Sequence, residues 1–122
     1  MPIVTVEVVA DPDRRLEHNL TQSLADAIGR ALRSPPGQTW VRLRMLQRNE
    51  YAENGALVDA AELPIFVTLL ERQPPTGAEL QAEVTALTHA VAQVIARPAG
   101  SVHVEYAPAA AGRISFGGKL VP

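Results

Sequence analysis

The chain contains no cysteine, which excludes disulfide bonds, thiolate nucleophiles and cysteine-ligated metal sites. Aromatic residues make up only 4% of the 122 residues, so the core must be built from aliphatic side chains. No stretch approaches the roughly 18 consecutive apolar residues of a membrane-spanning helix. No basic segment followed by an apolar run stands near the first residue, as a secretion signal would. We therefore expect a cytoplasmic protein that does not bind membranes.

An excess of charge of one sign is also lacking. The net charge is −2, which gives no electrostatic reason to expect a nucleic-acid partner. The loop after the first apolar run has no glycine with which to hold a phosphate, so no nucleotide cofactor is expected. The histidines His18, His89 and His103 are far apart in the sequence, so no histidine metal site is expected. The basic residues are arginines except for Lys119, and the planar guanidinium group of arginine suits carboxylate ligands.

An internal repeat organises the chain. Pro2-Ile3, followed by an apolar run, returns 62 residues later as Pro64-Ile65 with a second apolar run. Near the end of each copy, Asn54–Val58 in the first corresponds to Gly117–Val121 in the second, at an offset of 63. The repeat predicts one domain made of two tandem β-α-β copies, covering about residues 1–61 and 62–122.

Each copy shows the pattern of a strand, a helix and a second strand. Short β-branched runs predict strands over residues 3–9, 40–46, 64–70 and 102–106. Apolar residues at helical spacing predict one amphipathic helix in each copy, at Leu16, Leu20, Leu24, Ile28 and Leu32, and at Leu80, Val84, Leu87, Val91 and Val94.

The repeated order predicts an α/β fold with a four-stranded sheet and two helices on one face, the strands of each copy being parallel. Asp13 and Thr76 are the expected helix N-caps, and short hairpins are expected at Asn54-Gly55 and Gly117-Gly118. A ferredoxin-like arrangement has the same order of elements and is the alternative fold. The proline-led repeat argues against it.

Pro2 is the residue that most strongly suggests chemistry. Removal of Met1, which is expected before a small second residue, would leave a secondary amine at the tip of a strand. An α-amino group has a pKa near 8, and burial or a neighbouring arginine would lower that pKa further, so that Pro2 could act as a base. Pro64, its repeat counterpart, is an internal amide and takes no proton.

Three segments together resemble one known family, 4-oxalocrotonate tautomerase of the tautomerase superfamily. The segments are Pro2–Val6, Ser101–Tyr106 and Gly112–Leu120. The second copy resembles the family almost without gaps and the first more loosely, so the chain is similar to a fused, two-copy form. The resemblance implies a tautomerase/MIF-like fold, a homotrimer, a small carboxylate substrate and no cofactor.

The resemblance also implies a site. Pro2 would move a proton between oxygen and carbon of an enol acid, and Arg72 would hold the substrate carboxylate. Arg42 or Arg44 would form a second clamp, and Tyr51 would line the pocket or donate a hydrogen bond to the developing oxyanion. Three more positions are expected in the pocket where this sequence departs from the family: His103 replaces an arginine, Ile114 replaces an aromatic residue, and Phe116 stands where hydrating members carry a carboxylate.

The resulting hypothesis is a cofactor-free enol–keto tautomerase of a small 2-hydroxydienoate or enolpyruvate, which is an isomerase. One alternative is a hydratase, dehalogenase or decarboxylase of a small unsaturated acid on the same scaffold. Phe116 argues against hydration, although Glu53 occupies the equivalent place in the first copy. Another alternative is a non-catalytic trimer that binds a small acid or a protein. The sequence does not decide which subunit supplies each arginine.

Overall fold

A computed structural model describes residues 2–11 and 18–122 of the chain. Its main elements are four strands and two helices, with each half of the chain carrying the order strand, helix, strand. They are β1 (Ile3–Ala10), α1 (Leu20–Ala31), β2 (Trp40–Gln47), β3 (Ile65–Leu70), α2 (Gly77–Ile95) and β4 (Val102–Tyr106). Two short strands follow, β5 (Ser115–Phe116) and β6 (Lys119–Leu120), and 3₁₀ turns occur at Arg48–Glu50, Ala60–Glu62 and Ala99–Ser101.

The four main strands form one mixed sheet in the order β2-β1-β3-β4. β1 pairs in parallel with β2, and β3 in parallel with β4, while β1 and β3 are antiparallel at the centre. The two strands that a helix connects in each half therefore lie side by side and parallel, as expected. This order excludes the ferredoxin-like alternative, in which strands joined by a helix are separated by another strand.

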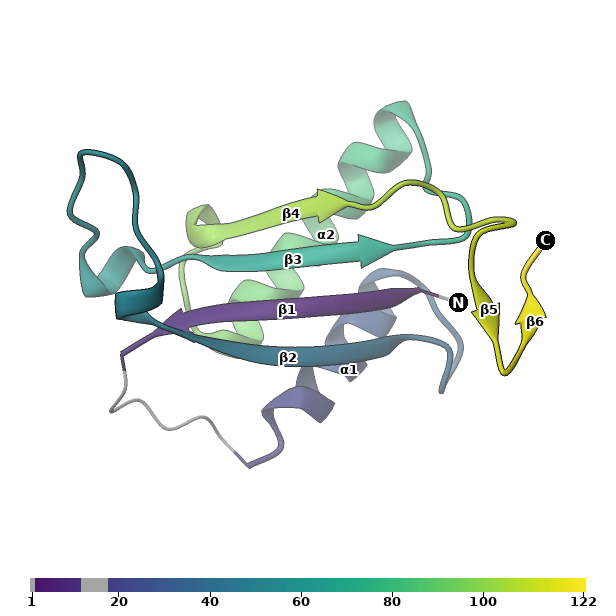
Figure 1. The fold of residues 1–122 in the computed structure, drawn as a ribbon, viewed down its shortest axis with the longest axis horizontal. Helices are drawn as coiled ribbons and strands as arrows, with labels where there is room; N and C mark the ends of the chain where they lie inside the picture. Colours follow the sequence, from purple (N-terminus) through teal and green to yellow (C-terminus); the bar gives the residue numbers. More distant parts are fainter. Residues whose placement is uncertain (1, 12–17) are drawn as a thin grey trace.

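Both helices cover one face of the sheet, behind the strands in the view of Figure 1. Alternate side chains of the central strands point to this face and are fully or almost fully buried. They pack against the apolar stripes of the two helices, and the core members are aliphatic, as the scarcity of aromatic residues requires. The central residues of this core are Val4, Val6, Val8, Leu24, Ile28, Ile65, Val67, Leu69, Leu87 and Val91.

The predicted strand boundaries agree with the structure to within one residue. The first helix begins later than predicted, at Leu20, with Asn19 in the N-cap position. Thr76 occupies the N-cap position of α2, although its side chain makes no capping hydrogen bond. Asp13 and Leu16 lie outside the described residues. The second copy ends in the expected hairpin, β5–β6, whose turn uses Gly117 and Gly118, both with positive φ. The corresponding segment of the first copy forms only an isolated bridge between Glu53 and Ala56.

The opposite face of the sheet carries no helix (Figure 1). It presents a mixture of half-exposed and exposed side chains, among them Thr5, Arg42, Phe66 and His103. In the described ranges, no helix combines the length and the apolar character needed to cross a bilayer. The division of the chain into two copies stays a prediction, since the shared order of elements does not by itself establish it.

Candidate active site

Pro2 lies where the first strand begins, at one end of the sheet. Its carbonyl oxygen accepts a hydrogen bond from the backbone N–H of Trp40, 3.0 Å away, which fixes the strand end against β2. The Pro2 ring lines a cleft of about 450 Å³, together with Leu32, Ser34, Pro35, Gln38 and Glu71. A reactive group at position 2 would therefore face a cavity of the size that holds a small molecule.

The cleft wall opposite the sheet is the loop that ends α1. The N–H of Leu32 donates to Ile28 and that of Ser34 to Gly29, which satisfies the last helical carbonyls. Gly37, with φ of +78°, lets the loop turn back toward the sheet. Its carbonyl accepts a hydrogen bond from the indole N–H of Trp40 at 3.2 Å. The loop is thus bonded to the helix on one side and to β2 on the other.

An aromatic pair lies at the same end of the sheet. Trp40 and Phe116 meet edge to face, with ring centroids 4.9 Å apart and an interplanar angle of 85°. This contact attaches β5 to the start of β2 through Trp40, the same residue whose backbone N–H is bonded to Pro2. Trp40 is still 44% exposed, so it can contact a ligand. Phe116 was expected in the site, but Trp40 was not.

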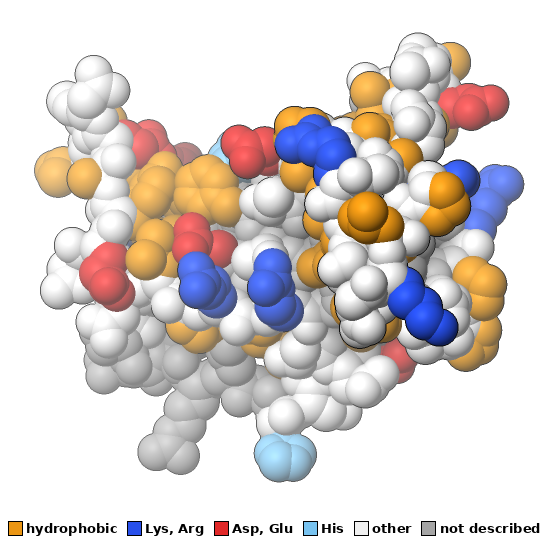
Figure 2. All heavy atoms as spheres, turned by 45° about the vertical axis from the view of Figure 1, so that its right-hand side comes forward, with side chains coloured by type: hydrophobic (Ala, Val, Ile, Leu, Met, Phe, Trp, Pro, Cys, Tyr) orange, Lys and Arg blue, Asp and Glu red, His pale blue; other side chains and the backbone are white. Residues whose placement is uncertain are grey.

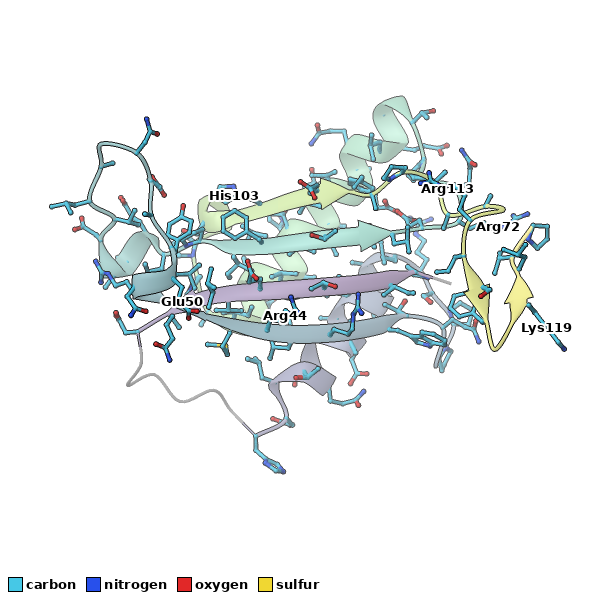
Figure 3. All side chains as sticks on the ribbon, in the orientation of Figure 1. Arg44, Glu50, Arg72, His103, Arg113 and Lys119 are labelled. Atoms are coloured by element: carbon cyan, nitrogen blue, oxygen red, sulfur yellow. The ribbon has the colours of Figure 1, made fainter. Side chains whose placement is uncertain are left out.

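Arg72 lies at this end too, where the chain leaves β3. Figure 3 shows Arg72, Arg113 and Lys119 gathered around the β5–β6 hairpin, near the N-terminal end of β1. The Nε group of Arg72 donates a 2.6 Å hydrogen bond to the carbonyl oxygen of Pro122. Its position is therefore set by Pro122, a partner that the sequence did not suggest. Arg72 itself does not line the Pro2 cleft.

Ile114 and Arg113 line a separate, smaller cleft of about 230 Å³, between the end of β3 and the segment after β4. Figure 2 shows this side of the molecule, where basic and hydrophobic side chains lie next to one another on the surface. Ile114 thus comes to the same end of the sheet as Pro2, but not into its cleft.

Arg42 and Arg44 project from the uncovered face of β2, which is the edge strand. Arg42 lies opposite Thr5 of β1 in the register, and its Nη2 donates a hydrogen bond to the Thr5 hydroxyl at 3.2 Å. Arg44 lies opposite Glu7. Both guanidinium groups are exposed. Arg42 is nearer to the Pro2 end, since it follows Trp40 by two residues.

Tyr51 and His103 lie toward the other end of the sheet. Both flank Phe66, with ring centroids 5.8 Å and 5.7 Å from it. The Tyr51 hydroxyl donates to Glu53 at 2.5 Å, and this hydrogen bond, with a small contribution from burial, raises the pKa of Tyr51. A single chain therefore brings Pro2, Arg72 and Phe116 to one end, and places Tyr51, His103 and Glu53 away from them.

Glu71 is a cleft residue that the sequence analysis missed. Burial of its carboxyl group, followed by hydrogen bonding and repulsion from Glu83 of α2, raises the pKa of Glu71 to about 8. The Tyr106 hydroxyl in turn donates to Glu83 at 2.6 Å, and burial and this contact raise the pKa of Tyr106. The sequence did offer one indication of Glu71: it is a charged residue directly after the apolar run of β3, at the end of β3 that pairs with the start of β1.

The raised pKa of Glu71 makes stability depend on pH. Because the folded protein holds this proton up to about pH 8 while an unfolded glutamate loses it near pH 4.5, folding should become less favourable as pH rises between these values. We expect a lower unfolding temperature at pH 8.5 than at pH 5.5, and a smaller difference in Glu71→Gln. Glu79→Gln, on the first turn of α2, is the control. An equal pH dependence in all three proteins would contradict this assignment.

A metal-binding cluster is not found in the part of the chain that the structure describes, where no three histidine, aspartate or glutamate side chains gather as metal ligands. We assign no metal ligand to any residue.

Comparisons with known proteins place the fold. No protein-family model and no curated protein sequence matches the chain. Solved structures do match. A native fused 4-OT shares 18% identity, with 97% of this chain and 94% of that chain covered and a TM-score of 0.74. The F6 fused 4-OT, described as an asymmetric trimer, shares 22% identity, with 95% and 94% covered and a TM-score of 0.71.

A third similar structure has a different activity in its description. FG41 malonate semialdehyde decarboxylase, inhibited by 3-bromopropiolate, shares 16% identity, with 94% of this chain and 88% of that chain covered and a TM-score of 0.66. At these identities the likeness establishes the fold and leaves the reaction open. The chain has the fold of these fused 4-OT structures, with four strands in one sheet and two helices on one face.

Proposed function

We propose that the chain is a cofactor-free enol–keto tautomerase of a small 2-hydroxydienoate or enolpyruvate, with the amine of Pro2 as its base. The observation that carries the proposal is the position of Pro2. It stands at the start of β1 and lines a cleft of about 450 Å³. Removal of Met1 would create a secondary amine at this ligand-sized space. Arg72, Arg113 and Lys119 at the same end of the sheet would attract an anionic substrate (Figure 3).

The proposed reaction moves one proton and needs no other reactant. The neutral Pro2 nitrogen accepts the proton of the 2-hydroxyl group, which forms the ketone and shifts the double-bond electrons onto carbon. The Pro2 ammonium then gives the same proton to that carbon, which restores the free amine. Substrate and product have the same composition. The proline ring limits where the nitrogen points, which favours a positioned base.

The arginines are proposed to hold the substrate carboxylate. Arg72 is the main anchor, because it projects at the Pro2 end and the Pro122 carbonyl engages only its Nε, leaving its Nη groups for a carboxylate. Arg42 is the nearer of the two β2 arginines and would form the second clamp. Phe116 and Trp40 would supply an aromatic wall, with Ile114 beside it.

We further propose a homotrimer. The F6 fused 4-OT is described as a trimer, and this chain leaves one face of its sheet without helices. Half-exposed apolar side chains on that face, such as Ile3, Phe66 and Leu70, would be buried against neighbouring copies. Assembly would also allow Tyr51, His103 or Arg44 of one subunit to approach the Pro2 of another. Within one chain they lie apart.

The function is tested by ketonisation of 2-hydroxymuconate or phenylenolpyruvate, followed by ultraviolet absorbance. We expect rates above the uncatalysed reaction without added metal or cofactor. If the protein turns over neither acid at substrate concentrations that saturate the enzyme, the proposal is contradicted.

Hydration, dehalogenation or decarboxylation of an unsaturated acid is the second candidate. One observation favours it: Glu71 places a carboxyl group in the Pro2 cleft, and hydration needs a carboxylate to activate water. The raised pKa of about 8 keeps most Glu71 protonated at neutral pH, which weakens this reading. Release of halide from 3-haloacrylates at pH 9, with slower release at pH 7, would support it over the tautomerase.

A further inference from the structure

We propose that Glu71 is the acidic partner of the Pro2 amine, so that the two groups share one proton in the free site. The inference rests on the proposed function in one respect, since it requires Pro2 to be a free amine. It adds a residue to which neither the sequence nor the fold assigns a role. Glu71 acts here through Pro2 and is therefore a positioning residue.

Strand pairing brings the two residues together. β1 and β3 run antiparallel with Ile3 opposite Leu70. Extended by one step, this register sets the residue before Ile3 opposite the residue after Leu70, which are Pro2 and Glu71. Both also line the same cleft. The pairing of two central strands thus holds a carboxyl group beside the amino terminus that removal of Met1 creates.

One oxygen of the Glu71 carboxyl group is available to bond the Pro2 amine. Its Oε1 is buried and makes no hydrogen bond to any of the described residues. A buried polar atom without a partner costs about 1 to 3 kcal/mol, so a group that is introduced beside it is readily bound. The amine of a processed chain is such a group, because it can donate or accept a proton there.

The other charged groups around Glu71 explain why it would keep its proton. Glu83 of α2 lies against it and is hydrogen-bonded by Tyr106 of β4, so a second negative charge is unfavourable. Glu79 and Arg33 share the adjoining cleft with Glu83. Arg72 is next in sequence but donates to Pro122. The positive charge of the amino terminus acts in the opposite direction and lowers the pKa of Glu71.

The exchange is balanced as a single proton transfer. The protonated Glu71 carboxyl gives its proton to the neutral Pro2 nitrogen, which yields a carboxylate and an ammonium ion, and the reverse step restores both. Because a carboxylate beside an ammonium ion favours the charged amine, ionised Glu71 raises the proton affinity of Pro2. Glu71 would thereby set the pH range in which Pro2 is a free base.

The test is a pH titration of the Pro2 nitrogen by NMR in protein labelled with ¹⁵N-proline, without substrate. A terminal proline nitrogen titrates, whereas the internal proline nitrogens are amides. We expect Glu71→Gln to lower the pKa of Pro2 by about one unit or more, because glutamine cannot supply the carboxylate that stabilises the ammonium ion when the shared proton lies on Pro2. Glu79→Gln removes the same charge from an exposed site on α2 and should shift this pKa by much less.

An unchanged pKa of Pro2 in Glu71→Gln would overturn the inference. If that variant does not fold, the carboxyl carbon of Glu71 is titrated in the unaltered protein. Its curve should show two steps, one of them at the midpoint of Pro2, since coupled groups titrate together. A single step elsewhere would overturn the inference. The enol-acid assay tests the proposed function separately. If the protein is active but the pKa of Pro2 does not shift in Glu71→Gln, only the role of Glu71 is wrong. If that pKa shifts but the protein has no activity, only the tautomerase proposal is wrong.

Discussion

Replacing Pro2 with alanine should lower kcat/KM for enol-acid ketonisation by about 100-fold or more, within the range that a positioned base contributes. An alanine in second place also permits removal of Met1, so the Pro2→Ala variant keeps a terminal amine. That amine lacks the ring that fixes its direction. The loss should appear in kcat, because the base acts on bound substrate. Stopped-flow or steady-state ultraviolet assays with 2-hydroxymuconate would measure it.

Pro35→Ala is the matched control for this variant. Pro35 lines the same cleft as Pro2 but carries no basic nitrogen, since it is an internal residue. It should retain a rate within a few-fold of the unaltered protein. Full activity of Pro2→Ala, or equal losses in both variants, would remove the catalytic role from Pro2.

Replacing Arg72 with glutamine should lower kcat/KM by about 10- to 100-fold, the loss expected for one charge-assisted hydrogen bond pair of roughly 1.5 to 3 kcal/mol. Most of the loss should appear as a higher KM, because the carboxylate of the substrate is bound in the ground state as well. Arg72→Lys should recover only part of it, since lysine keeps the charge but loses the planar fork.

Lys119→Gln is the control for long-range attraction. Lys119 lies at the same end of the molecule and is exposed, on the β5–β6 hairpin (Figure 3). Its loss should raise KM by no more than about threefold at about 0.15 M salt, where exposed charges are screened. If Lys119→Gln and Arg72→Gln raised KM equally, the arginine would contribute only charge and would not be the carboxylate anchor.

The fold was largely readable from the sequence. The β-branched runs after Pro2 and Pro64 predicted the two central strands, because alternate residues of each run must be buried under the helices. The apolar spacing from Leu20 to Ile28 predicted α1 for the same reason. The parallel pairing of β1 with β2 followed from the helix that connects them. The sequence did not show that the first-copy tail forms only one bridge at Glu53 and Ala56.

The candidate site was less readable, because it depends on contacts between distant segments. Pro2 was identifiable by its position, and Arg72 by its place after β3. The contact of Arg72 with Pro122 joins residues 50 positions apart, and no periodicity predicts it. Glu71 was missed since its significance comes from the register of β1 with β3 and from Glu83 on α2. Tyr51 was expected in the pocket by repeat equivalence, and His103 because it stands where the resembled family has an arginine. One chain places both beside Phe66.

The central claim is that Pro2 is a free amine in the functioning protein, and the intact mass of the protein purified from its own cells tests this most directly. We expect a mass lower than the encoded one by a single methionine residue. The Pro2 nitrogen can then take a proton and face the cleft. A mass that retains Met1 would contradict the account, because Pro2 would be an amide with no basic nitrogen.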